Sequence, residues 1–385
     1  MQIREVFDRK RFVFLDGGMG TQLQARGLQP GQKPELAALE MPEVLTAIHT
    51  DYANAGADIL LANTFGANAK KLTGCGHTVE EVVSASIACA RKAAETTGAC
   101  VALDIGPLGE LLVPAGTLAF EDAYNEFAQV IRAGAAAGAN LVFLETMTDL
   151  YELKAAILAA RENCDLPVFT SMSFESRGRT FTGCTVESYA VTAAGLGADA
   201  VGINCSLGPK EIFPMAKRLT EALPGSFPVF VKPNAGLPRA DGSGYDITPQ
   251  LYAMQMKPYR ELGLFAAGGC CGTPPAHIAA LRAELDSLPV VEKTTPAEEF
   301  STVKEQTVEN EDAFLRKLNA GEKVIAIELD SPRNADLTGY LEGAKKLQAA
   351  GADLLTIADC PIAQARMDSS LVACRVHREL GLCTL

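Results

Sequence analysis

Three cysteines in the second half of the chain have the residue type and the setting of metal ligands. Cys270 and Cys271 are adjacent in the run GGCCG, and Cys205 ends the run VGINC. In both places the cysteines follow a short apolar segment with the composition of a strand. Three thiolates that meet at strand ends can bind a zinc ion and leave its fourth coordination position for a substrate. Such a metal lowers the pKa of a bound substrate thiol below its free value of about 8.5, which supplies a nucleophile at neutral pH.

Two alternatives compete with an open zinc site. Cys270 and Cys271 could be buried packing residues, since consecutive residues of a regular strand point to opposite faces. The flanking glycines argue against this, because they let the backbone turn both sulfurs toward one metal. A structural zinc site would need a fourth protein ligand, and the four histidines fall in expected helices or loops away from strand ends. Most of the other cysteines among the 11 are expected to be reduced and buried.

The segments that would position these thiols repeat a helix-to-strand turn. Similar phrases built around Gly-Ala occur at 55–60, 137–142 and 196–201. Each follows an amphipathic helical stretch and opens an apolar strand, and its glycine suits a helix C-cap, where a left-handed backbone is needed. This repetition is typical of parallel α/β proteins.

Apolar segments of strand length recur along the first part of the chain. We expect strands at 12–15, 59–62, 101–103, 141–144, 168–171, 200–203, 229–231 and 264–267, with a helix between successive strands and the last helix at 275–285. Eight β/α units over roughly 285 residues predict an α/β fold of the (β/α)8 TIM-barrel type.

Polar residues and glycines follow most of these strands. They are Asp16-Gly17-Gly18, Asn63-Thr64, Asp104, Glu145-Thr146, Asn204-Cys205, Lys232-Pro233-Asn234 and Cys270-Cys271. Caps and turns would account for one or two of them. The carboxyl ends of the strands line the active site in this fold. Polar residues at the ends of so many strands therefore indicate a functional site.

Charge and hydropathy exclude several classes of function. The formal net charge of -13 opposes binding to nucleic acid or anionic membranes, and no stripe of Lys and Arg offsets it. The first 11 residues lack the apolar stretch of a signal peptide, and no apolar run is long enough to span a bilayer. We therefore expect a cytoplasmic protein without nucleic-acid or membrane partners; its oligomeric state is left open.

The composition changes after residue 288, which divides the chain into three parts. Residues 1–288 form the predicted barrel, and 289–322 read as a solvated linker with a helix near 309–318. Residues 323–385 show a second α/β pattern, with a strand at 324–328, a helix at 336–350, a further helix-to-strand phrase at 351–357 and a helix at 369–380. Two β/α units cannot close a barrel, so we expect a fragment of a larger domain or a segment that packs on the barrel.

The strand-end motifs resemble the homocysteine S-methyltransferase family, in the form that cobalamin-dependent methionine synthases carry as their N-terminal module. The matching segments are 15–21, 63–68, 104–107, 145–149, 202–206, 232–236 and 268–273. The resemblance implies that Cys205, Cys270 and Cys271 bind zinc, and that the homocysteine sulfur takes the fourth position and attacks a methyl group. It implies a (β/α)8 barrel over about 12–288.

Further residues of the predicted site follow from the same resemblance. Asp16 and Glu145 match positions that hold the amino-acid end of homocysteine, where each carboxylate gains a charge-assisted hydrogen bond from the ammonium; capping or a rim ion pair is the alternative. The backbone of Gly17 and Gly18 can approach the substrate because it lacks side chains. Asn234 is a candidate to supply an oxygen to zinc when substrate is absent.

The resemblance implies that methionine is the product, with methylcobalamin or a methyl-corrinoid protein charged from 5-methyltetrahydrofolate as the donor. S-methylmethionine or S-adenosylmethionine is the alternative donor. Other interpretations are a homocysteine-activating subunit of a split methionine synthase, and a zinc-storage or structural barrel. The stretches 326–332 and 352–359 resemble the start of a methylenetetrahydrofolate reductase barrel. Since about a quarter of such a barrel is present, we expect no working flavin site. The sequence also shows no resemblance to the pterin-binding and cobalamin-binding modules of a full methionine synthase, so we expect the methyl donor to arrive on another molecule.

Overall fold

The computed structural model describes residues 12–239, 244–286, 288, 313–334, 336–358 and 366–385. The chain divides into two compact units, Met1–Glu298 and Glu299–Leu385. Each is described by itself. None of the helices in the described ranges is long and apolar enough to cross a membrane.

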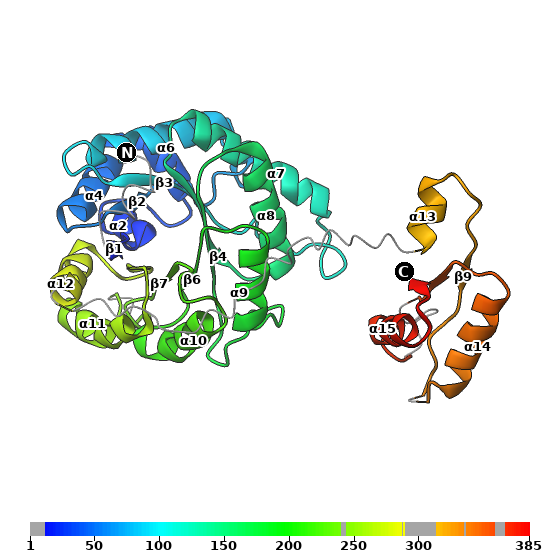
Figure 1. The fold of residues 1–385 in the computed structure, drawn as a ribbon. Helices are drawn as coiled ribbons and strands as arrows, with labels where there is room; N and C mark the ends of the chain where they lie inside the picture. The colour runs from blue at the N-terminus through cyan, green and yellow to red at the C-terminus, as the bar shows by residue number, and fades with distance from the viewer. Residues whose placement is uncertain (1–11, 240–243, 287, 289–312, 335, 359–365) are drawn as a thin grey trace. The chain divides into compact units, whose positions relative to one another are not determined.

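The first unit is a parallel barrel, as the repeated helix-to-strand turns predict (Figure 1). Its strands are β1 (Val13–Phe14), β2 (Ile59–Leu61), β3 (Cys100–Ile105), β4 (Leu141–Met147), β5 (Val168–Met172), β6 (Ala200–Asn204), β7 (Val229–Lys232) and β8 (Ala266–Ala267). They pair in the order β1-β8-β7-β6-β5-β4-β3-β2. A bridge between Leu15 and Ile59 joins β1 to β2 and closes the ring. The (β/α)8 prediction is confirmed.

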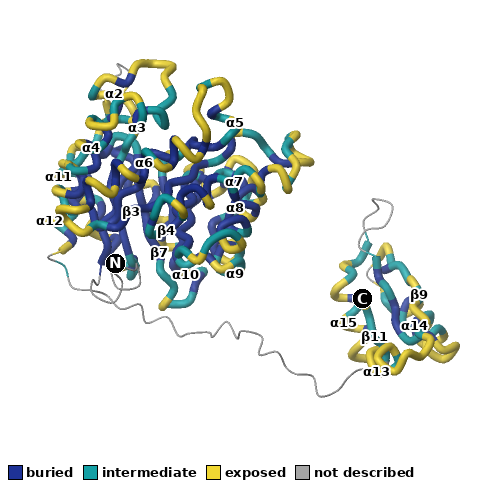
Figure 2. Tube along the Cα trace, turned by 90° about the horizontal axis from the view of Figure 1, so that it is seen from above, coloured by how far each residue is buried: buried dark blue, intermediate teal, exposed yellow. Residues whose placement is uncertain are grey.

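Helices surround the barrel and cover its wall (Figure 2). They are α2 (Met19–Ala25), α3 (Ala37–Glu40), α4 (Pro42–Asn54), α5 (Ala69–Leu72), α6 (Val79–Ala94), α7 (Phe120–Ala136), α8 (Leu150–Asn163), α9 (Val186–Gly195), α10 (Pro209–Glu221), α11 (Pro249–Met256) and α12 (Pro275–Asp286), with 3-10 turns η1 (Pro34–Leu36) and η2 (Lys257–Leu262). Local sequence explains where they begin. Thr78 forms a capping box with Glu81 at the start of α6, and α4, α10 and α11 begin with proline, which is preorganised for the first helical position.

The observed strands differ from the predicted ranges at their ends. β1 and β8 are shorter than 12–15 and 264–267, whereas β3 and β4 continue past 103 and 144. Asp104 and Glu145 therefore lie within strands, rather than after them as the sequence suggested. Polarity was a poor guide to the strand ends, because a side chain at the mouth of a barrel can be polar while its backbone continues the ladder.

Apolar side chains fill the inside of the barrel below the mouth. They are Val13, Leu15, Ile59, Leu61, Cys100, Ala102, Leu141, Phe143, Phe169, Ala200, Phe230 and Ala266. The rings of Phe143, Phe169 and Phe230 pack with centroids 5.1 to 5.9 Å apart. Gly202 leaves room for this cluster, because a Cβ there would lie 2.4 Å from the ring of Phe230. A solid apolar layer thus forms the floor of the mouth.

The second unit is a small parallel sheet with three strands among the described residues. β9 (Ala326–Glu328), β10 (Leu354–Thr356) and β11 (Cys383–Thr384) pair in the order β11-β10-β9, with helices α13 (Ala313–Asn319), α14 (Thr338–Ala349) and α15 (Ser369–Leu380). The sequence indicated only two strands here, which is wrong, because β11 is too short to show a pattern. β9 begins two residues later than predicted. Residues 289–312 of the predicted linker lie outside the described residues, and so does the start of the predicted helix at 309–318.

Candidate active site

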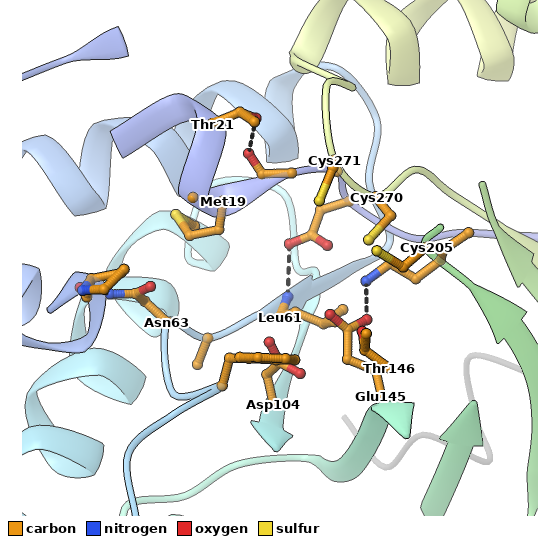
Figure 3. Close-up of a pocket in the computed structure, with 18 of the residues that line it drawn as sticks. Met19, Thr21, Leu61, Asn63, Asp104, Glu145, Thr146, Cys205, Cys270 and Cys271 are labelled. Carbon is orange, nitrogen blue, oxygen red and sulfur yellow. Dashed lines mark hydrogen bonds and ion pairs between the residues drawn. The ribbon is translucent and has the colours of Figure 1, made fainter. Parts of the chain in front are cut away.

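The three cysteines singled out in the sequence lie together at the mouth of the barrel. The sulfur atoms of Cys205, Cys270 and Cys271 are all within 4.8 Å of one another, and Figure 3 shows them pointing toward a common center. Cys205 directly follows β6, and the other two follow β8. Elements far apart in the sequence therefore deliver the donor set of a thiolate metal site.

Backbone hydrogen bonds fix the two adjacent cysteines. The N–H of Cys270 donates to the carbonyl of Pro233 (2.9 Å), and the N–H of Cys271 donates to Oδ1 of Asn234 (3.1 Å). Asn234 thus lies beside the thiols, with its oxygen engaged by a backbone amide. Gly272 follows at φ 74°, a conformation that suits glycine and turns the chain so that both sulfurs face the same way.

The ring of Tyr245 lies against this turn. A Cβ on Gly272 would be 2.1 Å from Cγ of that ring, so only glycine leaves the space. Hydrogen bonds from Cys205 and Cys270 lower the pKa of Cys271 to about 3, and the Tyr245 side chain also lowers it. Hydrogen bonds with Cys205 and Cys271 in turn raise the pKa of Cys270 well above its ordinary value. The three thiols therefore interact electrostatically, since each shifts the pKa of its neighbours.

A second group at the mouth consists of three carboxylates and one lysine. Asp16 follows β1, Asp104 lies on β3, Glu145 on β4 and Lys232 on β7, and all four side chains are buried. Nζ of Lys232 lies 2.7 Å from Oε2 of Glu145 and 5.2 Å from the centroid of the Phe143 ring. Lys232 therefore forms a buried ion pair with Glu145.

The other two carboxylates have oxygens without a partner. Asp16 accepts a hydrogen bond from the N–H of Leu61 through Oδ2 (2.8 Å), but its Oδ1 has none, and neither does Oδ1 of Asp104. Burial raises the pKa of Asp16 to about 7, although Lys232 lowers it. Burial and the neighbouring Glu145 raise the pKa of Asp104 well above its usual value. The group therefore has more carboxylate than cation, which favours a positively charged ligand.

Both groups line one cavity of about 230 Å³. Its walls also include Gly17, Gly18, Met19, Thr21, Glu35, Asn63, Phe65 and Thr146. Gly17 and Gly18 are also needed for packing against the loop after β8. A Cβ on Gly17 would lie 2.1 Å from the carbonyl oxygen of Thr273, and a Cβ on Gly18 would lie 2.7 Å from that of Cys270. The thiols and the carboxylates thus face the same enclosed space.

Several residues at the site escaped the sequence reasoning. Asp104, Thr146 and Asn204 were seen only as polar strand ends, and Tyr245 was not noticed. A polar residue at the carboxyl end of an apolar strand segment is the signal that could have found the first three. Tyr245 comes from a loop after β7, and no local pattern predicts that its ring reaches Gly272.

Comparisons with known proteins show the family of this chain. The family model described as "Homocysteine S-methyltransferase" matches residues 13–285. Methionine synthase of Mycobacterium tuberculosis (strain ATCC 25618 / H37Rv) is 34% identical over 305 residues, covering 72% of this chain and 25% of the relative. The enzyme of the same name from Mycobacterium leprae (strain TN) is 33% identical over 299 residues, covering 71% and 24%. The chain thus spans about a quarter of the length of these relatives.

Solved structures show the same fold. The oxidized form of the homocysteine methyltransferase MmuM from Escherichia coli aligns with a TM-score of 0.63 at 25% identity, covering 73% of this chain and 98% of that one. Its metallated form aligns with a TM-score of 0.62 at 24% identity, covering 73% and 99%.

Proposed function

This chain belongs to the homocysteine S-methyltransferase family, and from that premise we propose that its barrel transfers a methyl group to the thiol of homocysteine, giving methionine. One observation carries the proposal. A single cavity has three converging cysteine sulfurs and, within the same walls, carboxylate oxygens that lack a partner. An amino acid with a thiol side chain would place its sulfur at the first group and its ammonium at the second.

We propose zinc as the metal of the three thiols. The fit rests on the donor set, because three cysteine sulfurs within 4.8 Å of one another match the soft ligands that zinc prefers. Cys205, Cys270 and Cys271 would hold the ion, which when bound keeps a substrate thiol ionised at neutral pH. Asn234 stays a proposed oxygen donor in the absence of substrate. Its Oδ1 accepts from the N–H of Cys271, which keeps the amide next to the sulfurs.

The carboxylates would orient the amino-acid end. We propose that Oδ1 of Asp16 and Oδ1 of Asp104 accept hydrogen bonds from the substrate ammonium, which would relieve two buried atoms that now lack a partner. Glu145 would contribute through Oε1, since Oε2 is bound to Lys232. Lys232 keeps Glu145 in place and reduces the repulsion among the three acids. Gly17 and Gly18 line the cavity and would contact the substrate through their backbone.

We propose a methyl-corrinoid donor, either methylcobalamin or a corrinoid protein charged from 5-methyltetrahydrofolate. The support is the identity of 34% to a methionine synthase over 72% of the chain. S-methylmethionine or S-adenosylmethionine is the competing donor. The fold shared with MmuM is compatible with this alternative.

The test is methionine formation by the zinc-loaded protein given homocysteine and methylcobalamin, with S-methylmethionine in a parallel reaction. Product from methylcobalamin supports the corrinoid donor, and product only from S-methylmethionine replaces it with the sulfonium donor. A protein that binds zinc but forms no methionine from either, also with a corrinoid protein added, refutes the proposed function. Cys164→Ala is the matched control, because this half-buried cysteine caps α8 and does not line the cavity.

We also propose that residues 323–385 derive from the start of a methylenetetrahydrofolate reductase-like barrel. The parallel order of β9, β10 and β11 is what such a barrel segment would show. We expect no flavin binding by this part of the chain, and titration of the protein with flavin, followed by absorbance and fluorescence, tests this.

A further inference from the structure

Asn204 occupies the last position of β6, directly before Cys205, and its side chain is fully buried. Its amide contacts three other parts of the barrel. Oδ1 accepts from the N–H of Thr146 (2.9 Å) and from Oγ of Ser171 (2.9 Å), and Nδ2 donates to Oγ1 of Thr146 (2.7 Å) and to Sγ of Cys270 (3.8 Å). Both acceptor positions and both donor hydrogens of the amide are therefore used.

The orientation of this amide follows from its partners. A backbone N–H can only donate, so the group 2.9 Å from the nitrogen of Thr146 must be the amide oxygen. The amide nitrogen then faces Oγ1 of Thr146 and the sulfur of Cys270. The reverse orientation would place two donors against each other and would offer an oxygen to the sulfur.

The backbone beside Asn204 and at its partner Thr146 has an unfavourable conformation. Thr146 has φ 60°, which a β-branched residue rarely adopts, and Cys205 and Ser206 have φ 63° and 60°. In the described ranges of the chain these three are the non-glycine residues with positive φ, and all three lie at this site. Such conformations persist where surrounding contacts hold them, and two of those contacts on Thr146 come from Asn204.

We infer that Asn204 is a positioning residue for the thiol cluster. Its N–H donates to the sulfur of Cys270, which fixes that side chain and withdraws charge from the thiolate. Its bonds to Thr146 hold the irregular end of β4, where the register shifts next to Glu145. One amide thereby sets the distance between the thiols and the carboxylates, the two ends of the substrate site. The inference rests on the proposed function in that it takes the thiols to be metal ligands.

Hydrogen bonds from outside the ligand set commonly tune a metal site. Removing such a partner typically costs about 10- to 100-fold in metal affinity. An N–H directed at a thiolate also lowers the energy of the sulfur electrons, so the charge-transfer absorption of a bound open-shell metal moves when the hydrogen bond is lost. A residue that only supports the fold would change stability without moving that absorption in the folded protein.

The experiment compares wild type, Asn204→Asp and Ser171→Ala. Asn204→Asp keeps the size and the oxygen that accepts from Thr146, and in its ionised form it has no donor hydrogen, so the metal titrations are made at pH 8 and above. Ser171→Ala removes a different partner of the same amide and leaves the contact with Cys270. The two readouts are zinc affinity, by competition with a chromophoric chelator, and the thiolate-to-cobalt absorption of the protein loaded with Co²⁺.

We expect Asn204→Asp to weaken zinc binding by about 10- to 100-fold and to move the cobalt band to lower energy. We expect Ser171→Ala to stay within about threefold of wild type, with an unmoved band. Wild-type affinity and an unmoved band in Asn204→Asp would overturn the inference. If that variant does not melt cooperatively, Asn204→Ser carries the same expectations, because its short hydroxyl cannot replace the amide at Cys270.

These outcomes separate the inference from the proposed function. A wild-type protein that binds zinc but does not methylate homocysteine refutes the function, while the comparison of metal affinities still decides the role of Asn204. A wild-type protein that takes up neither zinc nor cobalt refutes both. An active wild type with an unaffected Asn204→Asp refutes the role of Asn204 alone.

Discussion

The floor and the mouth of the barrel are built from the same strands but carry opposite chemistry. Side chains two residues apart on a strand point the same way, and the change occurs within one such step. On β4 the step leads from Phe143 to Glu145, and on β7 from Phe230 to Lys232. The floor is a packed apolar layer, whereas the cavity at the mouth is lined by four acids, one lysine and three thiols.

The difference between floor and mouth shows how stability and function are divided. The floor has no polar side chain to satisfy, and its aromatic cluster contributes to folding through packing and burial. In the mouth, buried oxygens of Asp16 and Asp104 lack partners, which lowers stability in the absence of a ligand. Substitutions in the floor should therefore reduce stability without weakening zinc binding. Substitutions in the mouth should impair zinc binding or activity without reducing stability.

The largest expected effect is in the mouth. Cys270→Ala removes one of the proposed ligands, so we expect methyl transfer to fall by at least about 100-fold and zinc to be lost during purification. The metal-free variant should melt within a few degrees of the metal-free wild type, as measured by circular dichroism. Retained activity with bound zinc would show that Cys270 is not needed.

In the floor, Phe169→Ala leaves a cavity between Phe143 and Phe230. We expect it to lower the free energy of unfolding by about 3 to 5 kcal/mol in urea denaturation. Zinc affinity of the folded variant should remain close to wild type, because Phe169 does not line the site cavity. A variant that keeps its stability but loses zinc would contradict the division between floor and mouth.

His49 lies on helix α4, outside the barrel strands. It tests whether buried polar atoms without a hydrogen-bond partner are enough to indicate a functional site. Both of its ring nitrogens lack a partner, and burial lowers its pKa to about 3. Because the unfolded histidine titrates near 6.5, stability is present above that pH and is lost as pH falls toward 3. The loss should reach about 2 kcal/mol at pH 5.

We expect His49→Leu to remove that acid-dependent loss without changing methyl transfer at pH 8, since His49 does not line the cavity. Urea denaturation of both proteins at pH 8 and pH 5 measures it. An unchanged loss between these pH values would show that another group causes it.

The smallest effect is a gain of stability in the mouth. Asp104→Asn removes a buried carboxylate whose pKa burial raises, so the variant should be more stable by about 1 kcal/mol at pH 8. The gain should vanish as the pH falls below about 4, where the unfolded aspartate is also protonated. Thermal melts at both pH values measure it. The KM for homocysteine should rise in the same variant, and an unchanged KM would remove Asp104 from the proposed site.

The sequence predicted the barrel and the meeting of its thiols, because strand order and strand ends determine both. It could not predict that Glu145 binds Lys232 or that Oδ1 of Asp104 lacks a partner, since these depend on side-chain directions across the mouth. Nor could it reveal the contacts of Asn204, whose partners lie 33 to 66 residues away. The strand β11 was missed because two residues carry no periodicity.

On several strands the last side chain that points into the barrel is polar, and the one before it is apolar. This arrangement has an evolutionary consequence. If the proposed site is right, a substitution at Asp104 or Glu145 would change what the mouth recognises, while the packed layer one step below would keep its shape. New specificity can therefore be acquired by single mutations without passing through an unfolded intermediate. A lineage of such barrels can exchange one substrate for another while its floor stays nearly constant.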